Sequence, residues 1–253
     1  MMSGMTLTWP ARGTPRGTIV LLHGLMARAT TWWRTGPALA ELGWDTCAVD
    51  LPGHGQAPRL PGAVDLDGFA AALAERLPDR VDVLVGHSLG GLTALAVAHR
   101  RPDFARALVL EDPPGALADG ERYLMSLAIE ADGELIGTQR AMLLDRQRTA
   151  NPGWAEQDIA NSIEGIAAAD APALAAALRA ALRADLPRLV RAVPVPVLVL
   201  AATRDSALRG DRDAVRQLLP ADRFVELAGG HCLHRDVPAQ WVKAVSAFAD
   251  TMV

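Results

Sequence analysis

A serine framed by glycines, in the run Gly86-His87-Ser88-Leu89-Gly90, is the clearest candidate nucleophile of the chain. An apolar, β-branched run precedes it at 81–85, and a helical pattern follows it. A serine on such a strand-to-helix turn is held above a sheet by strained backbone, which flanking glycines accommodate. The N–H of Leu89 would lie at a helix N-terminus, where it can stabilise a developing oxyanion. The stretch therefore predicts nucleophilic catalysis by Ser88.

A catalytic serine needs a base within hydrogen-bond reach, and the base needs a third group to orient it. In open α/β sheets such groups gather at the carboxyl ends of the strands. Three residues that follow predicted strands fit these roles, namely Asp112, Asp205 and His231. The order serine, aspartate, histidine is also the order expected when a strand-turn-helix holds the nucleophile.

The elements that would position these residues follow from hydrophobic periodicity and from glycine and proline breaks. Strands are predicted at 5–9, 18–22, 45–49, 81–85, 107–110, 195–201 and 223–227. Helices are predicted at 31–42, 65–77, from Ser88 to near 102, at 211–219 and at 238–248, with Asp236 a candidate cap of the last. This alternation predicts an α/β fold with a mostly parallel, doubly wound sheet.

The alternation stops between 113 and 193, where the sequence holds only helix-like segments, at about 119–130, 134–149, 155–168 and 172–186. A block of helices between two strands of one sheet indicates an insertion. We expect residues 1–112 and 194–253 to form the core, with 113–193 as a helical lid over one end of the sheet. A separate helical domain of unrelated purpose is the alternative.

The motifs together resemble those of the α/β-hydrolase superfamily, in particular its lid-bearing group of esterases, lactonases and meta-cleavage C–C hydrolases. The matching residues are His23-Gly24, Asp50-Leu51-Pro52-Gly53-His54-Gly55, Gly86-His87-Ser88-Leu89-Gly90-Gly91, Asp205, Gly230-His231 and His234-Arg235-Asp236-Val237-Pro238. The resemblance covers nearly the whole chain except the lid. It implies an α/β-hydrolase fold and a Ser–His–Asp triad.

The resemblance assigns the base to His231, because it directly follows the glycine after the last strand. His234, three residues later, is the rival, with packing or hydrogen bonding beneath the loop as its alternative role. For the acid, the resemblance favours Asp205 after the penultimate strand. Asp112 ends the preceding strand, where some family members carry the acid, and stays as the alternative.

An oxyanion hole needs two N–H donors. Leu89 supplies one, and the resemblance places the second on Leu25, directly after His23-Gly24, with Met26 as the alternative donor. Met26, Trp32 and His87 are also candidates for lining the substrate pocket. Core packing is the competing interpretation for Trp32, and a structural role is the competing interpretation for His87.

Composition limits the classes of partner. The chain has 253 residues, half of them hydrophobic, and a formal net charge of −4, which indicates neither nucleic acid nor an anionic membrane as a partner. The two cysteines are too few for a disulfide scaffold, and no secretory leader or membrane-spanning run is apparent. We therefore expect a cytoplasmic protein, monomeric or homodimeric, that acts on a small molecule.

No cofactor and no metal is predicted, since neither metal-ligand spacing nor a dinucleotide-binding glycine motif is present. The predicted function is that of a serine hydrolase that cleaves an ester, thioester or lactone of a small to medium apolar substrate through an acyl-enzyme. The alternatives are C–C bond hydrolysis, acyl transfer or cyclisation by the same triad. A non-catalytic ligand-binding protein of the same fold is a further alternative.

Overall fold

The computed structural model describes residues 6–180 and 183–252, and its strands form one seven-stranded sheet. The strands are Thr6–Trp9 (β1), Gly17–Leu22 (β2), Trp44–Val49 (β3), Val81–His87 (β4), Ala105–Glu111 (β5), Val197–Ala202 (β6) and Phe224–Leu227 (β7). Their order is β1-β3-β2-β4-β5-β6-β7. Only β1 runs antiparallel to its neighbour; all the other pairs are parallel. The predicted mostly parallel α/β sheet is confirmed.

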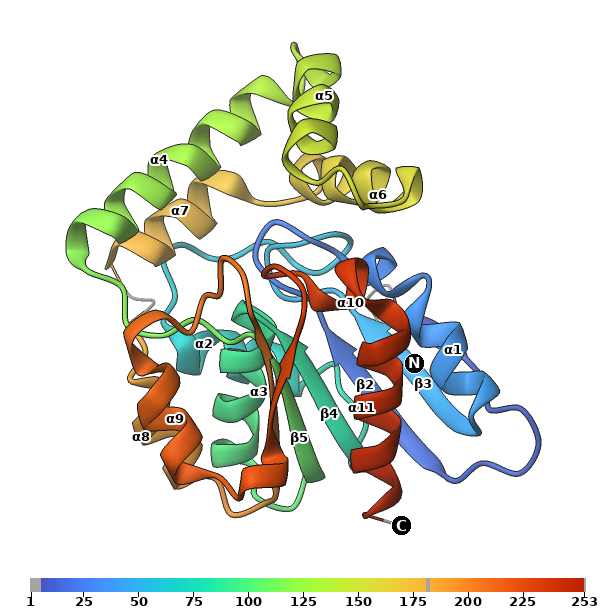
Figure 1. The fold of residues 1–253 in the computed structure, drawn as a ribbon. Coiled ribbons are helices and arrows are strands. Elements are labelled where there is room, and N and C mark those ends of the chain that lie inside the picture. Colours follow the sequence, from blue (N-terminus) through green and yellow to red (C-terminus); the bar gives the residue numbers. More distant parts are fainter. Residues whose placement is uncertain (1–5, 181–182, 253) are drawn as a thin grey trace.

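Helices cover both faces of this sheet (Figure 1). Those of the sheet layers are Thr35–Glu41 (α1), Leu66–Ala74 (α2), Leu89–Arg100 (α3), Leu186–Ala192 (α8), Arg212–Leu218 (α9) and Pro238–Asp250 (α11). Short turns of helix lie at Ala29–Trp32 (η1), Arg209–Asp211 (η2), Ala221–Arg223 (η3) and Leu233–Asp236 (α10). Helices α1 and α11 contact each other on one face, and α2, α3, α8 and α9 form a contiguous layer on the other.

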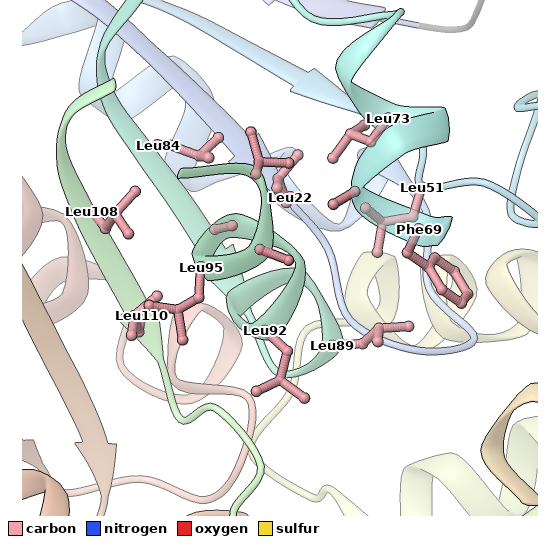
Figure 2. Packing of buried hydrophobic residues seen from close by; sticks show 14 of the residues in the cluster. Leu22, Leu51, Phe69, Leu73, Leu84, Leu89, Leu92, Leu95, Leu108 and Leu110 are labelled. Atoms are coloured by element: carbon pink, nitrogen blue, oxygen red, sulfur yellow. The ribbon is translucent and has the colours of Figure 1, made fainter. Parts of the chain in front are cut away.

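The strands divide their side chains between two cores, as the period of two in a β-strand requires. Ile19 and Leu21 of β2 pack in the core under α1 and α11, whereas Leu22 of the same strand packs in the core under α2 and α3. Figure 2 shows this second core, in which Leu22 of β2 lies between Leu84 of β4 and Leu73 of α2 in the view. Because both faces are covered, the central strands are continuous apolar runs.

The path of the chain places a crevice at the middle of the sheet. After β2 the chain forms β3 on one side, then crosses over to form β4 on the other side of β2. The carboxyl ends of β2 and β4 therefore diverge at a topological switch point, where α/β sheets bind their ligands. The loop with Leu25 leaves β2 at this point, and Ser88 leaves β4 there.

Four helices lie over the carboxyl edge of the sheet (Figure 1). They are Asp119–Leu135 (α4), Arg140–Ala150 (α5), Glu156–Ala167 (α6) and Ala171–Ala180 (α7), and we call this segment the helical insertion. Of the one helix predicted at 172–186, the structure describes the part to Ala180 as α7; residues 181–182 lie outside the described residues, and 183–185 are not helical. A new helix, α8, follows Asp185, whose carboxylate accepts the N–H of Arg188. Helix α8 contacts α3 and α9, so it lies in a sheet layer although the sequence placed it within the lid.

Throughout the described part of the chain, no helix is both long enough and apolar enough to span a lipid bilayer.

Candidate active site

Ser88 lies on the turn between β4 and α3 with φ 52° and ψ −120°. A positive φ is strained for a residue with a side chain and is commonly found at functional sites. Close backbone contacts explain the flanking glycines, since a Cβ on Gly86 would lie 2.3 Å from the carbonyl oxygen of Gly90. A Cβ on Gly90 would lie 2.5 Å from the carbonyl oxygen of Leu22. The structure thus has the strained strand-to-helix turn that the sequence predicts.

His231 follows β7 and lies in the wall of the same cavity as Ser88. Its Nδ1 lies 2.7 Å from Oδ2 of Asp112, whose side chain is fully buried at the end of β5. Because a carboxylate only accepts, Nδ1 carries the proton and Nε2 is left as the basic nitrogen. No hydrogen bond joins Ser88 to His231 among the described residues, but such pairs often tighten only when substrate binds.

The carboxylate of Asp112 accepts further hydrogen bonds besides the one from His231. Its Oδ1 accepts hydrogen bonds from Ser206 Oγ at 2.6 Å and from the N–H of Ala202 at 3.1 Å. Its Oδ2 also accepts from the N–H of Ala207 at 2.8 Å. Burial acts to raise the pKa of Asp112, but the hydrogen bonds from His231, Ser206 and Ala207 outweigh it and hold the pKa below its ordinary value. The carboxylate is therefore ionised and fixed beside the imidazole.

The structure differs from the sequence prediction at Asp205, which was favoured as the acid. The Asp205 side chain lines the cavity, and no hydrogen bond or ion pair of it occurs among the described residues, whereas Asp112 contacts His231. The physical reason lies in the loop after β6. Ser206 and Ala207 direct their donors to Asp112, so the neighbours of Asp205 in sequence complete the shell of the other aspartate. Ser206 is a site residue that sequence reasoning missed, and its only local signal is its position next to Asp205.

The two predicted oxyanion donors, Leu25 and Leu89, both line the cavity. Among the described residues, neither of their N–H groups has a hydrogen-bond acceptor, as expected for Leu89 in the first turn of α3. The alternative donor, Met26, is excluded because its N–H donates to Nε2 of His54 at 3.1 Å. Leu25 and Leu89 thus each have an N–H group without a protein acceptor at the cavity, within the described part of the chain.

A cavity of about 390 Å³ lies between the edge of the sheet and the helices α4 and α7. Its apolar lining consists of aliphatic side chains, including Leu25, Leu66, Leu89, Leu92, Leu117, Met125 and Leu178. None of the three predicted pocket residues Met26, Trp32 and His87 belongs to this lining. Trp32 is fully buried in the core under α11. The ring of His87 lies beneath the loop that carries His231, with its Nε2 at 3.0 Å from the carbonyl oxygen of that residue.

Three arginines, Arg122, Arg183 and Arg209, also line the cavity. Each is paired with a carboxylate, the first two with Asp119 and the third with Glu121. The cavity thus combines an aliphatic interior with three arginines that share two carboxylate partners at the start of α4.

The sequence model of the alpha/beta hydrolase family matches residues 19–245 of this chain. The chain belongs to the alpha/beta hydrolase family. It is therefore an enzyme, a hydrolase from a family in which a serine nucleophile is typical.

The hydrolase is similar to curated proteins over much of its length. It is 35% identical over 196 residues to a pimeloyl-[acyl-carrier protein] methyl ester esterase of Neisseria meningitidis serogroup C, a match that covers 74% of this chain and 75% of the relative. It is 36% identical over 143 residues to the lipase LipV of Mycobacterium tuberculosis, a match that covers 55% of this chain and 52% of the relative.

Solved structures share the fold of the hydrolase at lower identity. MenH from S. aureus superposes with a TM-score of 0.76 at 18% identity, covering 98% of each chain. The enol-lactonase from Burkholderia xenovorans LB400 superposes with a TM-score of 0.71 at 21% identity, covering 97% of this chain and 96% of that one. At these identities the likeness establishes the fold alone.

Beneath the His231–Asp112 pair, the hydrolase contains a second buried histidine–carboxylate pair. Glu111 accepts the N–H and Nδ1–H of His234 at 2.9 and 2.7 Å and the indole N–H of Trp241 at 2.9 Å. Burial raises the pKa of Glu111 and lowers that of His234 well below its ordinary value. The predicted role of His234, hydrogen bonding beneath the loop, is the one observed.

His87, Glu111 and His234 form, among the described residues, a group with ligand atoms close enough to hold a metal ion, within 4.8 Å of one another. Both oxygens of Glu111 and Nδ1 of His234 already take part in hydrogen bonds. The remaining nitrogen of His234 lies 2.9 Å from the hydroxyl of Thr31. These protein partners account for the group as a hydrogen-bonded support under His231.

Proposed function

We propose that this hydrolase is a carboxylesterase that uses Ser88, His231 and Asp112 as its catalytic triad. The observation that carries the proposal is the hydrogen bond from His231 to a buried, ionised Asp112, beside a cavity that Ser88 also lines. The names of the relatives, a methyl ester esterase and a lipase, support hydrolysis of carboxylic esters.

The mechanism follows from the positions of the donors and acceptors. Nε2 of His231 removes the Ser88 proton while Oγ attacks the ester carbonyl carbon, and Asp112 stabilises the imidazolium that forms. The N–H groups of Leu25 and Leu89 donate to the oxyanion of the tetrahedral intermediate. Collapse of the intermediate breaks the bond to the alkoxy oxygen, which leaves as the alcohol with the proton from His231. A water molecule, deprotonated by the same His231, then attacks the acyl carbon and releases the acid and Ser88.

The lining of the cavity supports an uncharged acyl group of small to medium size as the substrate. Its wall is mainly aliphatic, which favours hydrocarbon. The three positive charges of Arg122, Arg183 and Arg209 face three carboxylates, namely their partners Asp119 and Glu121 and the cavity residue Asp205, so they leave no net positive charge for the ligand. We therefore expect alkanoate esters to bind better than esters with a second carboxylate.

Two measurements test the proposal. A fluorophosphonate should label wild-type protein at Ser88 and leave Ser88→Ala unlabelled, as peptide mass spectrometry would show. A panel of p-nitrophenyl esters from acetate to decanoate should be hydrolysed with a preference for acyl chains that fit the cavity. Labelling without turnover of any ester would instead indicate acyl transfer, cyclisation or C–C hydrolysis by the same triad, and absence of labelling would remove Ser88 as the nucleophile.

A further inference from the structure

The turn that directly follows His231 joins the core to the helical insertion. From the core, Glu111 binds the backbone and ring of His234, in α10. From the insertion, two residues contact the same turn, namely Trp154 in the connection from α5 to α6 and Ser162 in α6. The loop of the proposed base is therefore held from both sides.

Asp236, the last residue of α10, was expected to cap α11, but its carboxylate has other partners. Oδ2 accepts the N–H of Gly230, the residue before His231, at 2.5 Å. Oδ1 accepts the indole N–H of Trp154 at 2.5 Å. The guanidinium of Arg204 lies 3.8 Å from Oδ2 but is largely exposed, so it contributes little. The carboxylate thus connects the insertion to the peptide group that carries the base.

Arg235 fixes the orientation of the same turn. Its side chain is buried, and it donates to Thr31 Oγ1 through Nε and Nη2 and to Ser162 Oγ through Nη1. Its guanidinium also lies over the indole ring of Trp154, 4.5 Å from the ring centre. The indole that binds Asp236 is consequently fixed in position and not free to turn away.

Helix α6, next to Trp154, is closely seated on the core. A Cβ on Gly165 would lie 2.4 Å from the carbonyl oxygen of Met26, so the helix touches the loop that also carries Leu25. The amide of Asn161 donates to the carbonyl oxygen of Thr30 at 2.9 Å, and the indole N–H of Trp33 donates to Asp158 at 2.8 Å. These contacts fix the insertion on the core, and with it the indole that donates to Asp236.

We infer that Asp236 is a positioning residue for His231 and that Trp154 of the helical insertion sets the orientation of its carboxylate. The inference rests on the proposed role of His231 as the base. Asp112 holds the imidazole at one nitrogen, which leaves the ring able to pivot about that bond. The bond from Gly230 to Asp236 removes this freedom by fixing the backbone, and misplacement of a catalytic group by about 1 Å can cost as much as about 10²-fold in rate.

The test compares two indoles that make the same kind of bond between core and insertion. Trp154→Phe removes the donor to Asp236 and keeps a ring beside Arg235. Trp33→Phe removes the donor to Asp158 and changes no hydrogen bond of the loop that carries His231. We expect Trp154→Phe to lower kcat for a p-nitrophenyl ester about tenfold, and Asp236→Ala by up to about 10²-fold, with KM little changed. Trp33→Phe should keep kcat near that of wild type.

A second measurement does not depend on turnover. The exchange rate of the His231 Nδ1 proton, followed by NMR, reports how firmly the ring is held against Asp112, and we expect it to rise about tenfold in Trp154→Phe and Asp236→Ala but not in Trp33→Phe. Asp236→Asn, which keeps an oxygen for the Gly230 N–H, should recover part of the loss relative to Asp236→Ala.

Two results would overturn the inference. One is wild-type kcat and wild-type proton exchange in both Trp154→Phe and Asp236→Ala. The other is an equal loss in Trp33→Phe and Trp154→Phe, which would mean that docking of the insertion as a whole matters and the contact to Asp236 does not. If the wild-type protein hydrolyses no ester, the proposed function fails, and the pattern of proton exchange among the variants still decides the positioning role.

Discussion

The carboxyl edge of the sheet and the helical insertion above it are held by different kinds of interaction. At the edge, the fully buried carboxylates of Asp112 and Glu111 accept hydrogen bonds from imidazoles. In the insertion, ion pairs such as Arg146 with Asp132 lie near the surface, and α4 exposes 67% of Leu124. Buried polar groups are costly to leave unpaired and therefore fix one geometry, whereas exposed ion pairs and apolar helix faces tolerate change.

We expect the constraints on the reaction to lie where buried polar groups are paired. We infer that the edge determines the chemistry and that α4 and α7 determine mainly which substrates reach it. The contact of Trp154 with Asp236 is one of the points where the insertion reaches the edge. Substitutions at the edge should therefore alter kcat or stability. Most substitutions in the insertion should alter KM or have almost no effect.

The proposed acid at the edge should show the greatest effect of substitution. Asp112→Asn should lower kcat by roughly 10⁴-fold and leave the fold intact, because an amide cannot hold the Nδ1–H tautomer of His231 or stabilise its imidazolium. Asp205→Asn, the matched change in the loop after β6, should alter kcat far less. Steady-state kinetics of the two variants decide the point, and the reverse order of effects would assign the acid to Asp205.

The next effect is a loss of stability in mild acid that arises at the edge alone. Burial lowers the pKa of His23 to about 4 and that of His54 to about 3. The N–H of Leu51 donates to His23 and that of Met26 donates to His54, so a proton on either acceptor nitrogen would oppose a donor.

Because these folded-state pKa values lie below the unfolded value near 6.5, the unfolded chain binds more protons below that pH. The free energy of unfolding should therefore fall as the pH drops from about 6.5 towards 4, by up to about 2 kcal/mol per histidine at pH 5. Urea unfolding at pH 7 and pH 5 measures this change. The segment 113–193 contains no histidine. Local opening within α4–α7, measured by amide hydrogen exchange, should therefore not become easier between pH 7 and pH 5 in the way that we expect at the edge.

A smaller effect is expected where the insertion meets the substrate. Met125 of α4 lines the cavity, whereas Met142 of α5 is similarly exposed and does not. Met125→Ala should raise KM for a hexanoate ester several-fold, corresponding to about 1 kcal/mol of lost apolar contact, with kcat nearly unchanged. Met142→Ala is the matched control and should leave both constants unchanged. A drop in kcat in Met125→Ala would contradict the division between the edge and the insertion.

The smallest effect should come from the surface of the insertion. Arg146 lies 2.6 Å from Asp132, and both side chains are at least partly exposed. Arg146→Ala should lower the free energy of unfolding by less than about 1 kcal/mol and change neither kcat nor KM. Thermal unfolding together with ester kinetics checks this, and a loss of several kcal/mol would show that the insertion depends on its ion pairs as the edge depends on its buried bonds.

Much of the fold was predictable because it depends on local patterns. All seven strands were predicted within a few residues, since buried parallel strands are short apolar runs bounded by turns. Helix α8 was missed because the alanine-rich run at 172–186 continues the helical pattern through 183–185, which are not helical in the structure. The prediction that Asp236 caps the last helix was wrong, because its carboxylate accepts the N–H of Gly230. No local sequence pattern predicts this contact.

Local residue patterns were enough to predict the class of sheet, the strained turn at Ser88 and the position of His231 after a strand, because each depends on residue types within a few positions of one another. The tertiary structure places Asp112, and not Asp205, beside His231, because both aspartates follow strands and the loop after β6 directs its donors to Asp112. It also decided that Trp32 and His87 face the interior, since the direction of a side chain is set by packing between elements far apart in the chain.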